Sequence, residues 1–393
     1  MSQTVYVQHG GLTQLPPLSL YVHFPWCVRK CPYCDFNSHE ARGGLDDLAY
    51  VQALLLDLEH SLPAVWGRAV HTIFIGGGTP SLMSPAAMEM LLDGIRARVR
   101  LLPDAEITME ANPGTCEAEK FKAFRASGVN RLSIGIQSFD DRQLTRLGRI
   151  HDSRQAHAAL DLALTHFDNV NLDLMYALPE QTLPEALDDL SQGLAHGVTH
   201  LSAYHLTIEP NTLFYRYQPA GLPDEDLAAD MQEALEARLA ESGFVHYETS
   251  AFARPGRQCR HNLNYWQFGD YLGIGAGAHG KISSAEGIVR EMRYKQPAAY
   301  LQAVRDGDAA QSRQRVARKA LPFEFMMNLL RLTDGFELSL FAERTGLSLA
   351  SIQRQLALAE SQGLIERDLQ RLRPTLMGQR FLNDLLGMFL EED

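Results

Sequence analysis

"YVHFPWCVRKCPYCDFNS", residues 21–38, places three cysteines within eight positions. Cys27, Cys31 and Cys34 have the spacing C-x3-C-x2-C, and the whole chain has only five cysteines. The three follow an apolar run directly and share their loop with two prolines, so burial of all three in a core is not expected. Clustered cysteines of this kind indicate a metal or redox site.

The composition limits the classes of function. The chain has 393 residues, of which 45% are apolar, and a formal net charge of −12, so it has no general attraction to nucleic acid or to an anionic membrane. The first twenty residues lack a basic start followed by an apolar block, and no apolar run is long enough for a membrane span. We therefore expect a cytoplasmic protein without a transmembrane segment, in which reduced thiols bind metal rather than form disulfides.

Apolar, β-rich runs alternate with helical patterns along the first part of the chain. This alternation predicts an α/β fold with a parallel sheet and helices outside it. The spacing allows an open doubly wound sheet, but polar motifs at the carboxyl ends of the strands favour a partial (β/α)6 barrel. The expected strands are 18–24, 70–76, 105–111, 130–136, 169–176 and 199–206, and the expected helices are 45–62, 84–102, 117–128, 153–167, 184–197 and 224–243.

The chain changes character twice after the last of these units. Residues 244–315 are rich in glycine and aromatic residues and read as a smaller α/β extension of short strands and loops. Residues 316–393 show helical patterns near 317–331, 336–345 and 348–362, then a ribbon and a final helix. We expect a barrel over 1–243, the extension, and a C-terminal winged-helix-like domain. Its second helix is not strongly basic, so a DNA-binding regulator is disfavoured.

The cysteine cluster allows two kinds of metal site. His23 and His39 flank it, so a Cys3His zinc site is one alternative, although structural zinc sites normally take ligands from two separate pairs. Three thiolates also suit three corners of a [4Fe–4S] cluster. The fourth iron then has no protein ligand and is open to a substrate, which explains why a fourth cysteine is lacking.

This cysteine spacing, placed after the first strand of a βα barrel, resembles the radical S-adenosylmethionine (SAM) superfamily. The resemblance implies that SAM binds the open iron and is cleaved by an electron from the reduced cluster. It also implies a set of SAM contacts at the strand ends. These are Gly77, Gly78 and Thr79 of "GGGTP", Glu110 of "TMEANP", Gln137 of "GIQSFDD", Arg149, Asp173 of "NLDLMYALPEQT", Tyr33 beside the adenine, and Tyr21 close to the cluster.

These motifs and the C-terminal unit together resemble the coproporphyrinogen-oxidase-like branch of the superfamily. That branch contains an oxygen-independent coproporphyrinogen III dehydrogenase, which decarboxylates two propionates to vinyl groups, and haem chaperones. The dehydrogenase has a further cysteine at the position of Phe36 and a longer N-terminal arm, whereas "HNLNYW", residues 261–266, is typical of the chaperones.

The resemblance therefore favours a haem chaperone with a [4Fe–4S] cluster, a SAM site and haem as ligand. His261 is the expected haem ligand, because imidazole is a common axial ligand of haem iron; Cys259 and His279 are the alternatives. Haem-accepting proteins, membrane-bound respiratory enzymes among them, are the implied partners. We expect a monomer, or a dimer that depends on haem or cluster.

Overall fold

One large mixed sheet organises the molecule. The structure, a computed structural model, describes residue 12 and residues 14–390. The sheet has the strand order β14-β13-β12-β11-β1-β4-β5-β6-β7-β8-β10-β9, and its two ends do not pair, so it is curved but not closed into a barrel. Its six central strands are parallel, as the sequence predicted: β1 (Leu18–Phe24), β4 (Ala69–Gly77), β5 (Arg100–Ala111), β6 (Arg131–Gln137), β7 (Val170–Tyr176) and β8 (His200–His205).

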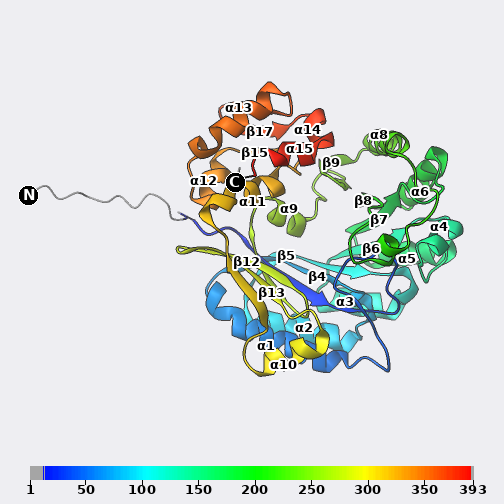
Figure 1. Ribbon diagram of the computed structural model, residues 1–393. Coiled ribbons are helices and arrows are strands. Elements are labelled where there is room, and N and C mark those ends of the chain that lie inside the picture. Colours follow the sequence, from blue (N-terminus) through cyan, green and yellow to red (C-terminus); the bar gives the residue numbers. More distant parts are fainter. Residues whose placement is uncertain (1–11, 13, 391–393) are drawn as a thin grey trace, which may run out of the picture.

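Helices cover the outer face of these strands (Figure 1). Side chains on both faces of the central strands are buried, which is why the strands read as nearly continuous apolar runs. Most of the covering helices begin at a side-chain cap, and α5 and α6 begin with full capping boxes. The helices that follow the six strands are α1 (Asp47–Val65), α2 (Pro85–Arg98), α3 (Ala118–Ser127), α4 (Asp141–Arg146) with α5 (Ser153–His166), α6 (Leu183–Ala195), and α7 (Leu213–Arg216) with α8 (Glu225–Glu241).

One predicted boundary is wrong. The helical pattern was expected to run to residue 102, but α2 ends at Arg98 and β5 already begins at Arg100. Arg100 and Leu101 pair with Ala69 and Val70 of β4, so hydrogen bonding to the neighbouring strand determines the structure there and the local pattern does not.

Residues 244–315 extend the sheet at both edges. The strands β9 (Val245–Glu248) and β10 (Ala251–Ala253) continue it beyond β8, whereas β11 (Asp270–Ile274) pairs in parallel with β1. The domain boundaries at 243 and 315 stay predictions. The remaining elements of this segment are α9 (Arg260–Trp266), β12 (His279–Ser284), β13 (Gly287–Arg293), α10 (Pro297–Arg305) and β14 (Ala310–Arg315).

The C-terminal unit packs around a second apolar cluster, which also includes Phe268 and Ile288 of the preceding segment, and it lies beside the large sheet (Figure 1). It follows the expected order of helices and then a ribbon, except that residues 336–337 form a strand before the second helix. Phe325 packs edge-to-face on Phe268 of the preceding segment at 5.7 Å. The elements are α11 (Leu321–Leu329), β15 (Phe336–Glu337), α12 (Ser339–Thr345), α13 (Gln353–Ser361), β16 (Ile365–Arg367), β17 (Arg371–Pro374), α14 (Leu376–Arg380) and α15 (Leu382–Gly387).

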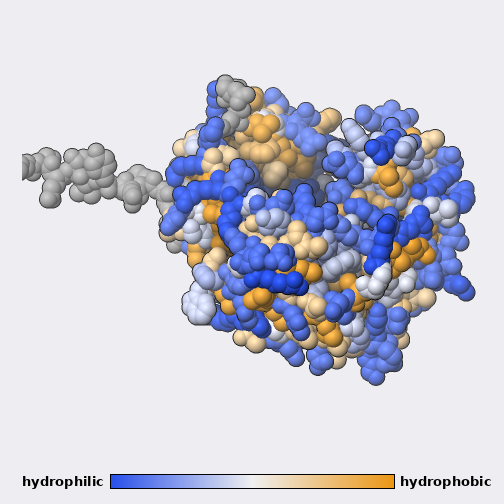
Figure 2. Space-filling model, turned by 60° about the horizontal axis from the view of Figure 1, so that its bottom comes forward, coloured by the Kyte–Doolittle hydropathy of each residue, from blue (hydrophilic) through white to orange (hydrophobic). Residues whose placement is uncertain are grey.

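The surface in Figure 2 is mainly polar, with apolar side chains in separate patches and a recess near the top of the view. Within the described part of the chain, none of the helices combines the length and apolar character needed to cross a bilayer. The expectation that the arm before Tyr21 is shorter than in the dehydrogenase concerns residues 1–20, most of which lie outside the described residues.

Candidate functional site

The three clustered cysteines share a loop that folds back on itself. The short strands β2 (Trp26–Cys27) and β3 (His39–Glu40) pair in parallel and close the loop, and a turn brings the Cys34 N–H within 3.2 Å of the Cys31 carbonyl. All three side chains are half-buried, and Cys31 and Cys34 line a cavity of about 820 Å³. Burial raises the pKa of the Cys27 and Cys34 thiols, so a bound metal that favours thiolates would replace protons there.

The same loop does not fit the zinc alternative. Within the described residues, no three His, Cys, Asp or Glu side chains are placed to hold one metal ion. Both ring nitrogens of His23 are occupied, by the Tyr21 hydroxyl at 3.0 Å and the Asn37 carbonyl at 2.9 Å, and His39 Nε2 faces the Lys295 carbonyl at 3.3 Å. An iron–sulfur cluster does not require the three thiolates to meet at one metal ion, because each thiolate binds a different iron atom. The donor set therefore fits a cluster better than a single zinc ion.

The "GGGTP" loop after β4 packs directly against the cysteine loop. The N–H groups of Gly78 and Thr79 donate to the carbonyls of Phe24 and Trp26, each at 2.7 Å. Gly77 has φ +110°, and a Cβ there would lie 2.4 Å from the His23 ring, so only glycine fits. The Gly77 N–H donates to Glu110 Oε2 at 3.0 Å. These glycines thus allow the carboxyl ends of β1, β4 and β5 to lie close together beside the cysteine loop.

The concave side of the curved sheet contains a cavity of about 410 Å³, which we call the lumen cavity; it extends from the carboxyl ends of the central strands to the starts of β6 and β8. Burial raises the pKa of Glu110 to about 7, although the Gly77 N–H lowers it, and the nearby carboxylate of Asp173 raises it further. Burial also raises the pKa of Asp173, which accepts hydrogen bonds from Asn171 at 2.7 Å and Ser133 at 3.1 Å. The sequence-predicted residues that line this cavity are Tyr33, Cys34, Glu110, Gln137 and Asp173.

Arg149 lies behind this cavity rather than in its lining. Its Nη1 is 3.6 Å from Cys31 Sγ and 3.4 Å from the Tyr33 hydroxyl, and its Nη2 donates to the Gly135 carbonyl. Arg149 therefore links the cysteine loop to β6 and places a positive charge beside one sulfur donor.

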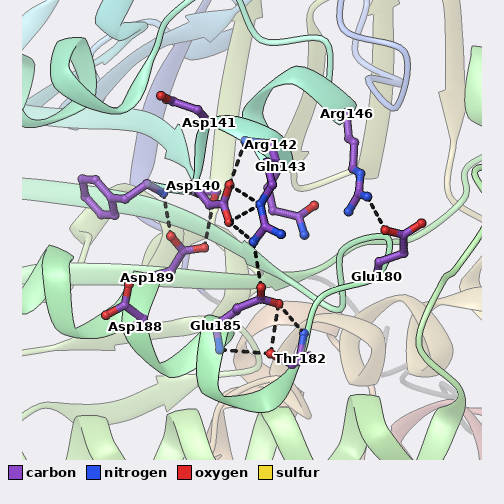
Figure 3. Close-up of polar contacts among 12 residues, drawn as sticks. Asp140, Asp141, Arg142, Gln143, Arg146, Glu180, Thr182, Glu185, Asp188 and Asp189 are labelled. Atoms are coloured by element: carbon purple, nitrogen blue, oxygen red, sulfur yellow. Dashed lines mark hydrogen bonds and ion pairs between the residues drawn. The ribbon is translucent and has the colours of Figure 1, made fainter.

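Gln137 has a positive φ of +74°, which is uncommon for a residue other than glycine. The turn that follows is fixed to α6, as Figure 3 shows: Asp189 accepts from the Phe139 N–H at 2.6 Å and from the Ser138 hydroxyl at 2.7 Å. Arg142 joins this turn to Glu185 of α6 at 2.7 Å. These contacts hold Gln137 in its strained conformation at the cavity wall.

A larger cavity of about 650 Å³, here called the aromatic cavity, adjoins the lumen cavity. Asp35, Phe36, Phe74, Glu110 and Asn262 line both. Of the predicted SAM residues, Tyr21 and Gly77 line the aromatic cavity and not the lumen cavity, whereas Glu110 lines both. The remaining lining includes Tyr265, Trp266 and Tyr271, the histidines His261 and His279, and the lysines Lys30 and Lys295.

His261 is held in one tautomer. The single hydroxyl hydrogen of Thr72 donates to Ser19 Oγ at 2.7 Å, so Thr72 Oγ1 accepts from His261 Nδ1 at 2.9 Å. Nε2 then carries the lone pair, and it has no hydrogen-bond partner among the residues described. Burial, reinforced by the charge of Arg131, lowers the pKa of His261 to about 3. A neutral imidazole with its other nitrogen anchored to an oxygen is the arrangement typical of a metal ligand.

The two alternative haem ligands differ in placement. Cys259 is fully buried, donates to Glu106 Oε1 at 3.5 Å and lines neither cavity. His279 lines the aromatic cavity but is exposed. Three residues that the sequence arguments did not single out also belong to the site: Thr72, Lys30 and Lys295. Thr72 is a polar residue within an apolar strand run, and this interruption of the pattern could have indicated its role.

Comparison with known proteins agrees with this geometry. Residues 21–192 match the radical SAM superfamily, and residues 316–381 match the HemN C-terminal domain. The heme chaperone HemW of Escherichia coli is 50% identical and that of Haemophilus influenzae 46% identical, each over 97% of this chain and 100% of the relative. The solved structure of E. coli coproporphyrinogen III oxidase (HemN), a radical SAM enzyme, superposes with a TM-score of 0.81 at 25% identity, covering 95% of this chain and 90% of that one.

Membership of the radical SAM superfamily implies a [4Fe–4S] cluster and SAM, for which the cysteine loop and the lumen cavity have suitable donors. Sequence identity of 46% and 50% over the full length of these relatives is more specific evidence of family membership than similarity of fold. This chain therefore belongs to the haem chaperone HemW family of the radical SAM superfamily.

Proposed function

We propose that this protein binds haem in the aromatic cavity through His261 and passes it to acceptor proteins. The observation that carries the proposal is the neutral His261 imidazole, whose Nε2 is unpartnered while Nδ1 is fixed by Thr72 at 2.9 Å. Aromatic side chains suit the porphyrin face, and the ammonium groups of Lys30 and Lys295 suit its propionates. The curated relatives bear the name heme chaperone, which supports the same assignment.

In this proposal the cysteine loop and the lumen cavity hold the cofactors. Cys27, Cys31 and Cys34 would hold the [4Fe–4S] cluster, whose reduced form could supply an electron to bound SAM. Glu110 and Asp173 provide carboxylates for the SAM ammonium and ribose hydroxyls, Gln137 and Tyr33 complete the wall, and Gly77, Gly78 and Thr79 bring backbone groups close. Arg149 orients Tyr33 from behind, whereas Tyr21 lines the aromatic cavity in which haem would bind.

The proposal extends to partners and assembly. Haem acceptors are expected to include membrane-bound respiratory enzymes, and nucleic acid is not an expected partner. The protein works in the cytoplasm, where thiols are reduced. It is a monomer without ligands and dimerises when haem or the cluster is bound.

Coproporphyrinogen III dehydrogenation is the competing function, because the HemN fold is so similar. Phe36, 59% exposed, stands where the dehydrogenase has its extra cysteine and lines the aromatic cavity. An anaerobic assay with reduced, reconstituted protein, SAM and coproporphyrinogen III separates the two. We expect no protoporphyrinogen, and steady turnover would support the dehydrogenase.

Haem titration followed by absorbance tests the proposal. His261→Ala is expected to lower haem affinity by on the order of 10- to 100-fold, since an axial ligand is lost. Cys259→Ala and His279→Ala are matched controls at the two alternative ligands, and both are expected to stay near the wild-type affinity. If His261→Ala binds haem as the wild type does while His279→Ala does not, the axial ligand is His279 and the role given to His261 is wrong.

A further inference from the structure

Arg131, at the start of β6, is a buried charge without a partner. It is 2% exposed and lines the lumen cavity. Its Nε is buried without a hydrogen bond, and no guanidinium nitrogen of Arg131 forms a hydrogen bond or an ion pair with any residue in the described ranges. A guanidinium has five N–H donors, and leaving them unsatisfied in a protein interior is unfavourable, so this group requires an explanation.

The neighbouring carboxylates are already occupied by other donors. Glu106 accepts from the N–H groups of Arg260 and His261, each at 3.1 Å, at the start of α9. Asp173 accepts from Asn171 and Ser133. The acidic groups nearest to Arg131 therefore balance its charge without bonding to it.

The other polar groups around Arg131 satisfy each other. His200 bonds to Asn171 Oδ1 at 2.6 Å and to the Tyr247 hydroxyl at 2.7 Å, and Ser202 donates to Asn171 Oδ1 at 3.1 Å. Arg131 is thus a fully buried cationic residue of this cavity whose guanidinium has no hydrogen-bond partner within the described ranges. A guanidinium is planar and suited to a carboxylate.

We propose that Arg131 is a carboxylate-binding subsite, at the inner end of the lumen cavity, for a ligand that enters from the aromatic cavity. The two cavities meet at Phe74 and at Asn262, the residue after His261, and the His261 ring packs on Phe74 at 5.1 Å. Haem carries two propionates, of which Lys30 and Lys295 would suit one and Arg131 the other, so a haem propionate is the favoured source of the carboxylate. The free carboxylate of SAM is the other source with the same chemistry. The haem assignment rests on the function proposed above.

The test compares haem with haem dimethyl ester, in which both propionates are blocked. Wild-type protein is expected to bind haem about 10- to 100-fold more tightly than the diester, the range for charge-assisted hydrogen bonds. Arg131→Gln is expected to remove most of that preference while leaving the affinity for the diester unchanged. Arg100→Gln, which removes an exposed arginine from the adjacent strand β5, is the matched control and should keep the preference.

A second arm measures SAM binding to the reconstituted protein. If Arg131→Gln weakens SAM binding instead of haem binding, the subsite holds the SAM carboxylate. If a folded Arg131→Gln protein keeps both the haem preference and the SAM affinity, Arg131 is not a ligand subsite and the inference is overturned. Failure of the wild type to bind either haem or its diester would instead contradict the proposed function, and the SAM arm would still decide the role of Arg131.

Should Arg131→Gln fail to fold, Arg131→Lys replaces it. An ammonium keeps the charge but cannot make two parallel hydrogen bonds to one carboxylate, so the preference should fall by about tenfold. An unchanged preference in Arg131→Lys, with unchanged SAM affinity, would also overturn the inference.

Discussion

The Glu110 side chain lies where the lumen cavity and the aromatic cavity adjoin. Its carboxyl lines both and accepts the Gly77 N–H at 3.0 Å, and burial raises its pKa to about 7. Between about pH 4.3 and pH 7, Glu110 is therefore mostly protonated in the folded protein but mostly ionised in an unfolded chain. Because a raised carboxyl pKa opposes folding above the unfolded value, this residue costs stability progressively as the pH rises through that window.

The same titration predicts a pH dependence of SAM binding. SAM carries a sulfonium and an ammonium, so it should bind better when Glu110 is ionised, and affinity should rise by about tenfold between pH 6 and pH 8. Glu110→Gln should bind SAM more weakly and with little pH dependence, whereas Glu119→Gln, at an exposed site on α3, should retain the rise. Equilibrium dialysis with anaerobically reconstituted protein measures this. An equal rise in Glu110→Gln would assign the titration to another group.

Gly77 gives a second prediction at this scale. An alanine there would combine a positive φ with a clash against the His23 ring at 2.4 Å, so Gly77→Ala should lower the free energy of unfolding by more than about 2 kcal/mol and reduce iron incorporation. Gly67→Ala is the control, because Gly67 also has a positive φ but nothing lies within 4 Å of its Cβ position. Urea unfolding and iron analysis check both. Similar losses in the two variants would mean that backbone strain alone matters and that the contact with His23 does not.

At the scale of elements, a buried carboxylate on α1 holds the glycine-rich loop after β11. Asp57 accepts from the Tyr300 hydroxyl of α10 at 2.9 Å, from Arg293 Nε of β13 at 3.0 Å and from the Gly275 N–H at 3.2 Å. The next glycine of that loop, Gly277, lies so close to the side chain of Asn37 that a Cβ would be 2.2 Å from Asn37 Nδ2. The α1 helix thus supports the cysteine loop indirectly.

We therefore expect Asp57→Ala to destabilise the fold by about 3 to 5 kcal/mol, because it leaves the Gly275 N–H, the Tyr300 hydroxyl and Arg293 Nε buried without their acceptor, although Arg293 keeps its ion pair with Glu291. Glu59→Ala, on the same helix, removes only a surface ion pair with Arg98 and should cost about 0 to 1 kcal/mol. Chemical denaturation compares the two variants. Equal effects would show that the Asp57 contacts do not carry this stability.

The sequence predicted the repeated elements better than the irregular ones. Each central strand is an apolar run covered on both faces, and that pattern is local, so all six were found. The start of β5 was missed because its pairing with Ala69 and Val70 is not local. The helix α9 was not expected, because its seven residues are stabilised mainly by a cap from Glu106, which lies on a different strand.

At the scale of the whole molecule, the site depends on contacts between distant parts of the chain. His261 and its partner Thr72 are 189 residues apart, so the sequence motif indicated the histidine but not the group that fixes its tautomer. The C-terminal unit adds a further distant contact: the Arg331 guanidinium lies 4.3 Å from the centre of the Trp266 ring in the cavity wall. The tertiary fold, and not any local stretch of sequence, therefore brings the lumen cavity and the aromatic cavity side by side.

The most direct test of this account is anaerobic reconstitution with iron and sulfide, followed by metal analysis and addition of SAM. The account predicts about four irons per chain and a cluster spectrum that shifts with SAM. Cys27→Ala should lose the cluster, whereas Cys116→Ala, a half-buried cysteine outside the loop, should keep it. One zinc ion per chain in place of iron, or a cluster that survives removal of all three loop cysteines, would contradict the account.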